Sequence, residues 1–275
     1  DVYKRQNMIR LYTENDFEKM RDAAEILCQT HLAIQKVIKE GITTKQLDDF
    51  ANKFIVDHKN AVPAQLGYGG FPYTLCISVN DEICHGFPSD YVLKEGDIVS
   101  IDNVIDYNGG LADSCWSYAI GGLSDRDQKL MDVTLESLTR SIKEAKVGNR
   151  IGDIGHAIQE YAEVENDFSV IRDFIGHGIG KEMHEDPQVP HYGKAHHGPR
   201  IQAGMVFTIE PMIASGNWPM QLDDNGWVAR TKDGSNVCQY EHQLIIHEDG
   251  PEVITDQSKY SLTDDDLEFI DSYKF

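Results

Sequence analysis

The sequence predicts an α+β domain made of two related halves. Two helical segments, a group of strands, two more helical segments and a second group of strands follow one another along the 275 residues. Gly96-Asp-Ile-Val-Ser-Ile-Asp102 also aligns with Gly204-Met-Val-Phe-Thr-Ile-Glu210, 108 residues later, and each segment ends in a carboxylate. Two such halves would place Asp102 and Glu210 at equivalent positions, facing each other across a pseudo-twofold axis. A chance match of short apolar strands is the alternative.

Apolar residues at helical spacing predict four helices. The first runs from Asn15 to Ile38, and Thr43 or Thr44 can cap a second helix that ends near His58. Ser124 opens a third helix that ends near residue 148, and residues 151–165 form the fourth.

Short β-rich runs broken by Pro and Gly predict strands at 75–79, 97–107 and 111–118, and the segment 171–254 is again strand-like. Asn108-Gly109 is a strong hairpin signal, because both residues tolerate positive φ. A loop centred there pairs Asp113 with Val104, which puts Asp113 on the face of Asp102. Two carboxylates in an apolar strand context are costly unless protonated or bound to cations. The pair suggests a metal site, with solvent-facing aspartates on an edge hairpin as the alternative.

Composition bounds the protein class. A chain with 40% hydrophobic residues can bury the core of one large domain or two small ones. No stretch approaches the roughly 18–20 apolar residues of a membrane helix, so we expect a soluble, cytoplasmic protein. The net charge of -21 argues against nucleic-acid and membrane partners. Residues 1–7, before Met8, are expected to be non-native or disordered.

The cysteines do not suggest a cross-linked or thiolate-based site. Their number is odd, and they are scattered without a CxxC pair. Buried reduced thiols are therefore the better interpretation than a disulfide framework or a thiolate zinc site. They are Cys28, Cys76, Cys84, Cys115 and Cys238.

Three further segments contain side chains that can bind metals. Gly176-His177-Gly178-Ile179-Gly180 precedes a second histidine, His184, while Glu210 and Glu241 lie inside strand-like apolar runs. Each segment alone is ambiguous. Glycines beside histidines occur in ordinary tight turns, and a strand carboxylate often faces water.

Together these residues resemble a known set. Asp102, Asp113, His177, Glu210 and Glu241, in this order and context, resemble the metal-binding pentad of type I methionine aminopeptidases in the M24 family. The likeness extends over almost the whole chain from Met8. It includes Cys76-Ile-Ser-Val-Asn80, Cys84-His85-Gly86, His184-Glu-Asp-Pro187, Thr208-Ile-Glu-Pro-Met212 and Tyr240-Glu-His242.

The resemblance implies a pita-bread fold, in which helices cover a curved antiparallel sheet with an internal pseudo-twofold. It further implies a single metallopeptidase domain over residues 8–275, with repeats at about 15–147 and 148–262. The ligands would hold two divalent ions, Co, Mn, Fe or Zn, because four carboxylates and one imidazole form an oxygen-rich set.

The same resemblance implies individual roles. Asp113 and Glu241 would bridge the ions, Asp102 would hold one ion, and His177 with Glu210 would hold the other. A hydroxide bridging the ions would attack the peptide bond after an N-terminal methionine that precedes a small residue. The catalytic residues would be His85, which contacts the substrate amide, His184, which donates to the carbonyl oxygen, and Glu210, which shuttles the proton.

The substrate pocket implied by the resemblance combines aromatic and sulfur-bearing walls, which suit a thioether. Gln65 stands where the family frequently has a cysteine, and Met183 stands where an aromatic residue is frequent, which leaves the affinity of the pocket open. Ordinary core aromatics are the alternative for the ring-bearing members. The substrate-binding residues would be Tyr68, Phe71, Cys76, His85, Met183, His184 and Trp227.

Two other functions remain open at this point. An Xaa-Pro peptidase of the same fold would share the five ligands, but its usual large N-terminal domain is missing here. A non-catalytic binding module would have lost ligands, whereas all five are present. The run from His184 to Glu241 also leaves no room for the insertion of type II enzymes. Expected partners are nascent polypeptide N-termini, with the ribosome as a further candidate, and we expect a monomer.

Overall fold

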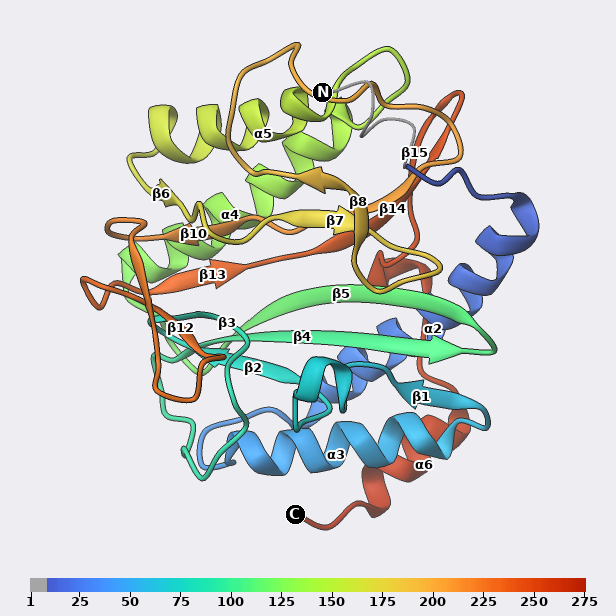
Figure 1. Ribbon diagram of the computed structural model, residues 1–275. Coiled ribbons are helices and arrows are strands. Elements are labelled where there is room, and N and C mark those ends of the chain that lie inside the picture. Colours follow the sequence, from blue (N-terminus) through green and yellow to red (C-terminus); the bar gives the residue numbers. More distant parts are fainter. Residues whose placement is uncertain (1–8) are drawn as a thin grey trace.

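The computed structural model describes residues 9–275, so the expectations for residues 1–7 and Met8 lie outside the described residues. Figure 1 shows the strands in the middle of the molecule, with α4 and α5 on one side and α3 and α6 on the other. The helices are α2 (Glu14–Val37), α3 (Thr44–Asp57), α4 (Asp125–Glu144), α5 (Ile151–Gln159) and α6 (Asp264–Ser272), with short turns η1 (Tyr68–Gly70), η2 (Glu160–Glu165) and η3 (Gln257–Lys259).

The strands of this region pair antiparallel in four sheets, which confirms the predicted α+β class. One sheet holds β1 (Ala61–Pro63), β2 (Cys76–Val79), β4 (Ile98–Tyr107) and β5 (Gly110–Ala119). A second holds β6 (Ser169–Val170), β10 (Met212–Ala214) and β13 (Val237–Gln239). A third holds β3 (Glu82–Cys84), β11 (Met220–Leu222) and β12 (Ala229–Thr231). The fourth holds β7 (Gly176–Gly178), β8 (Glu185–Val189), β9 (Val206–Ile209), β14 (His242–His247) and β15 (Gly250–Val253).

The helix starts follow from their caps. Thr43 rather than Thr44 caps α3, because its hydroxyl accepts the Gln46 N–H at 3.1 Å. Ser124 caps α4 as predicted. The fourth predicted helix is α-helical only to Gln159 and continues as the π-helical turn η2. Across residues 9–275 no helix is both long and apolar enough to cross a membrane.

The β4–β5 hairpin has the predicted register. Asn108 and Gly109 form the two-residue loop with φ of 51° and 85°, and Val104 is paired with Asp113. Asp102 and Asp113 therefore share one face of the sheet. The helix α2 packs on both strands, and its Leu27 is fully buried in the cluster that includes residues of β4 and β5.

Hydrogen bonds join the hairpin to the second group of strands. Glu241, between β13 and β14, donates its N–H to the Cys115 carbonyl of β5 at 2.9 Å. The Ser117 hydroxyl donates to the Gln239 carbonyl at 2.7 Å. These bonds hold the two carboxylate-bearing regions against each other, and all five cysteines are buried free thiols as expected.

Candidate metal centre

A cavity of about 340 Å³ lies between the two groups of strands, in the size range of small-molecule sites. Every site residue predicted from the sequence lines it. These residues are Tyr68, Phe71, Cys76, His85, Asp102, Asp113, His177, Met183, His184, Glu210, Trp227 and Glu241. Residues that the sequence did not single out, such as Phe174 and Met212, complete the lining.

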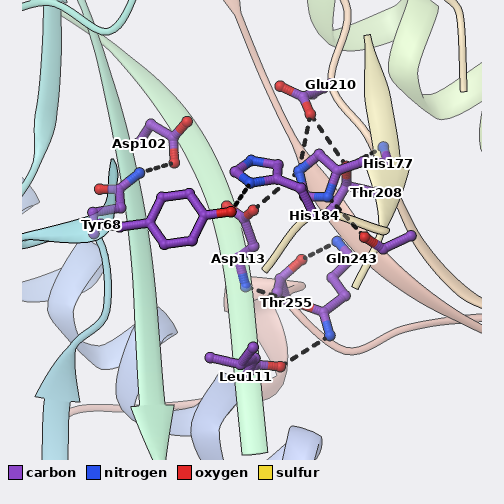
Figure 2. A network of polar contacts seen from close by, with 12 residues as sticks. Tyr68, Asp102, Leu111, Asp113, His177, His184, Thr208, Glu210, Gln243 and Thr255 are labelled. Atoms are coloured by element: carbon purple, nitrogen blue, oxygen red, sulfur yellow. Dashed lines mark hydrogen bonds and ion pairs between the residues drawn. The ribbon is translucent and has the colours of Figure 1, made fainter. Parts of the chain in front are cut away.

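The five predicted ligands line the same cavity, and Figure 2 labels Asp102, Asp113, His177 and Glu210 among them. His177 Nε2 lies 3.4 Å from Asp113 Oδ2 and 3.5 Å from Glu210 Oε1. Asp113, His177 and Glu241 can each offer a ligand atom, and these atoms all lie within 4.8 Å of one another. Asp102 lies beside Asp113 on the neighbouring strand, on the same face.

Two glycines let the strand that carries His177 approach its neighbours. A Cβ at Gly176 would lie 2.4 Å from the Thr208 carbonyl oxygen, and one at Gly178 would lie 2.2 Å from that of Asp186. No other residue fits without moving the strand. Because His177 Nδ1 contacts the Gly178 carbonyl at 3.0 Å, Nε2 faces the carboxylates.

The cluster carries more acid than its single cation can balance. Burial and then the charge of Asp113 raise the pKa values of Asp102 and Glu241 well above their usual range. Burial also raises the pKa of Glu210 to about 7. Burial alone lowers the pKa of His177, but Asp113 and Glu210 outweigh it and raise that pKa to about 9. The site therefore favours added positive charge, whether protons or metal ions.

Unpaired oxygens show that metal ions fit this cluster. Asp113 Oδ1 and both carboxylate oxygens of Glu241 are buried and have no hydrogen-bond partner within residues 9–275. A buried carboxylate oxygen without a donor is costly, and a divalent cation would satisfy it. Four carboxylates and one imidazole are also the donor set that catalytic divalent metals prefer.

The wall of the cavity beside the cluster is apolar. Phe71, Cys76 and Met183 are each at most 6% exposed. Trp227 packs edge-on against Phe71, with ring centroids 5.4 Å apart. His85 has a left-handed φ of 56°, which turns it toward the Trp227 ring, and burial lowers its pKa.

His184 stands at the exposed mouth of the cavity. Its Nδ1 contacts the hydroxyl of Tyr68 at 3.0 Å, and its ring centroid lies 4.3 Å from that of His177. Figure 2 shows His184 and Tyr68 between Asp102 and the His177–Glu210 side of the cluster. The pair thus lies beside the carboxylate cluster and lines the cavity.

The structure adds side chains that the sequence did not single out. Glu210 Oε1 accepts from the Thr208 hydroxyl at 3.2 Å, Oε2 accepts from Gln239 Nε2 at 3.1 Å, and its N–H donates to His191 Nε2 at 3.1 Å. Thr208 and Gln239 each lie two residues before a predicted ligand, and strand alternation could have found them. His191 is fully buried beside this backbone and packs behind the cluster.

Comparison with known proteins agrees with this geometry. A family model described as metallopeptidase family M24 matches residues 18–248. The chain belongs to this family. Methionine aminopeptidase 1 of Bacillus subtilis is 45% identical over 248 residues, covering 90% of this chain and 99% of the relative. The methionine aminopeptidase of Clostridium perfringens has the same identity and coverage.

Solved structures also resemble this chain, and methionine aminopeptidases resemble it more closely than prolidases do. The methionine aminopeptidase of Rickettsia prowazekii has a TM-score of 0.88 at 41% identity, covering 90% of this chain and 100% of that one. A prolidase from Pyrococcus furiosus has a TM-score of 0.72 at 21% identity, and the match covers 67% of it, which shows a shared fold. The predicted pita-bread fold and methionine aminopeptidase resemblance are confirmed, and the Xaa-Pro alternative is less well supported.

Proposed function

We propose that this M24 enzyme removes the N-terminal methionine from polypeptides with a small second residue. The observation that carries the proposal is the convergence of five metal-binding side chains on one cavity beside an apolar wall. A set of buried acids supplies charge for metal ions, and the adjoining wall supplies a pocket for a thioether.

The ligand roles are those that the family resemblance implies. Asp113 and Glu241, which hold the unpaired oxygens, would bridge two ions; Asp102 would bind one of them, and His177 with Glu210 the other. Bound there, Mn, Co, Fe or Zn would acidify a water molecule and polarise the scissile carbonyl.

The remaining steps belong to the side chains of the chain itself. Glu210, fixed by Thr208 and Gln239, would accept a proton and pass it to the leaving amine. His184 would donate a hydrogen bond to the substrate oxygen as negative charge develops there. His85, which also lines the cavity, would contact the substrate amide.

The apolar wall would hold the methionine side chain. Phe71, Cys76 and Met183 are preorganised by burial, and Trp227 closes the pocket against Phe71. Tyr68 is 46% exposed, so it would form the rim rather than the floor.

The test compares peptides on one enzyme preparation supplied in turn with Mn, Co, Fe and Zn. We expect methionine release from Met-Ala-Ser, little release from Met-Leu-Ser, and no cleavage of Ala-Pro peptides. Preferential cleavage of Ala-Pro would favour the Xaa-Pro peptidase. Inactivity with every metal would contradict the proposal and favour a binding module.

The proposed reaction implies further partners. Nascent polypeptide N-termini would be the substrates, so the enzyme would work in the cytosol near the ribosome. A monomer is expected because one chain supplies all five proposed ligands. Sedimentation velocity checks this expectation, and a dimer would contradict it.

A further inference from the structure

Two buried glutamine amides contact the two proposed ligands that lie at opposite ends of the cluster. Gln65 Nε2 donates to Asp102 Oδ1 at 3.1 Å, and Gln239 Nε2 donates to Glu210 Oε2 at 3.1 Å. Gln65 is 8% exposed and Gln239 is 2% exposed. Each carboxylate thus has its own amide donor.

The orientation of the Gln65 amide is fixed by its chemistry. When Asp102 is ionised, as a metal ligand must be, its oxygens only accept hydrogen bonds, so the amide turns Nε2 and not Oε1 toward it. This leaves Gln65 Oε1 buried without a partner among the described residues. An unpartnered buried acceptor is unfavourable, and a flipped amide would set two acceptors against each other. The bond to Asp102 therefore determines how Gln65 is placed.

The two carboxylates differ in how firmly they are held. Glu210 receives the Thr208 hydroxyl in addition to Gln239, and its backbone N–H is bonded to His191. For Asp102, Gln65 is the side-chain donor that the structure shows. Removal of the Gln65 amide should consequently free Asp102 more than removal of the Gln239 amide frees Glu210.

We propose that Gln65 and Gln239 are positioning residues that set the affinities of the two metal positions separately, Gln65 through Asp102 and Gln239 through Glu210. The inference rests on the proposed function, because it assigns Asp102 and Glu210 to different ions. Partners that orient a ligating carboxylate typically change metal affinity by about 10- to 100-fold.

The test uses Gln65→Met and Gln239→Met, which keep side-chain length and remove the amide. Mn²⁺ affinity is measured by titration calorimetry, and anomalous diffraction from crystals soaked at limiting Mn²⁺ gives the occupancy at each position. We expect Gln65→Met to weaken the Asp102 position by about 10- to 100-fold and to leave the Glu210 position unchanged. Gln239→Met should give a smaller loss, confined to the Glu210 position.

Two controls separate this effect from general damage. Gln65→Cys removes the amide with a different, shorter side chain, and it should repeat the site-specific loss. Gln221→Met changes an exposed glutamine of β11 and should bind Mn²⁺ like the parent. Unchanged Mn²⁺ binding in the Gln65 variants, or equal losses at both positions, would overturn the inference. A parent that binds no Mn²⁺, Co²⁺, Fe²⁺ or Zn²⁺ would instead overturn the proposed function itself.

Discussion

His184 combines exposure with a fixed orientation. The contact of its Nδ1 with the Tyr68 hydroxyl leaves Nε2 available toward the cavity. A donor placed where charge develops is worth more in the transition state than in the ground state. The position of His184, beside His177 and outside the carboxylate cluster, suits such a role.

Replacement of His184 by alanine should lower kcat for Met-Ala-Ser by about 10²- to 10³-fold, the usual loss for an oxyanion donor. The KM and the bound Mn²⁺ should stay close to those of the parent, because the five proposed ligands are intact. Steady-state kinetics and metal analysis measure both. His156→Ala, on the exposed face of α5, is the matched control. An unchanged kcat in the His184 variant would contradict the assigned role.

For individual residues, the sequence predicted the candidate metal ligands well, but it predicted few of the side chains that contact those ligands. Asp102 and Asp113 could be paired because the hairpin loop fixes their register. Gln65 could not be assigned to Asp102, because its position depends on how the chain folds back between β1 and β2. His191 likewise showed no pattern, since a lone histidine carries no information about the distant backbone that it will contact.

The β4–β5 hairpin is the element on which the site depends most. It carries Asp102 and Asp113, and its loop needs two successive residues with positive φ. Residues other than Gly, and to a lesser extent Asn, adopt that region at a cost of about 1–2 kcal/mol. The loop therefore fixes the register that aligns the two carboxylates.

Gly109→Ala should lower the free energy of unfolding by about 1–2 kcal/mol, because φ at this position is 85°. Urea unfolding followed by circular dichroism measures the change. Gly122→Ala is the control: its φ lies outside the left-handed region, and its Cβ would be 3.5 Å from the nearest neighbouring atom, Glu95 Oε1. Equal stability of the two variants would show that the loop conformation is not what Gly109 provides.

Long elements could be predicted and short ones could not. The periodicity of α2 and α3 extends over several turns, so their ends were found within a residue or two. The strands between 171 and 254 are three to six residues long, and pairing with distant partners decides their limits. The helix α6 was missed although Thr263 and Asp266 form a capping box at its start. Phe269 of α6 and Tyr273, which follows the helix, pack on Phe50 of α3, and this contact is not visible in the local sequence pattern.

The whole molecule brings together two groups of strands that lie far apart in the sequence. The bond between Glu241 and Cys115 joins them at the cavity. Local patterns predicted the strands in each group. The contact between the two groups is non-local, and predicting which residues meet there required the family resemblance. The division into repeats at about 15–147 and 148–262 stays a proposal. The similar placement of Asp102 and Glu210, each beside a glutamine donor, supports it.

The buried, neutral side chain of His31 should make the stability of the whole molecule depend on pH. His31 is fully buried on α2, and burial lowers its pKa to about 4. The unfolded chain, with a histidine pKa near 6.5, binds more protons between pH 6.5 and 4. The contribution of His31 to stability is therefore complete above pH 6.5 and is lost, by up to roughly 3 kcal/mol, as the pH falls to 4.

Comparison with His31→Leu isolates this contribution from other titrating groups. The variant should be less stable at pH 7, because it loses the contact of Nδ1 with the Tyr118 hydroxyl at 3.1 Å. The deficit should shrink or reverse at pH 5. Urea unfolding of both proteins at the two pH values measures the difference in stability. If the deficit of the variant grew on acidification, His31 would not be a neutral histidine in the folded protein.

The central claim is that five converging side chains hold the divalent ions on which methionine removal depends. Asp113→Asn tests it most directly, because Asp113 contacts His177 and has a buried unpaired oxygen in the middle of the cluster. Metal content and methionine release from Met-Ala-Ser are measured beside the parent. We predict two bound ions in the parent and fewer in the variant. The loss of activity should exceed the roughly 10- to 100-fold that follows when a residue that only orients a metal ligand is lost. A folded variant with the metal content and activity of the parent would contradict the claim.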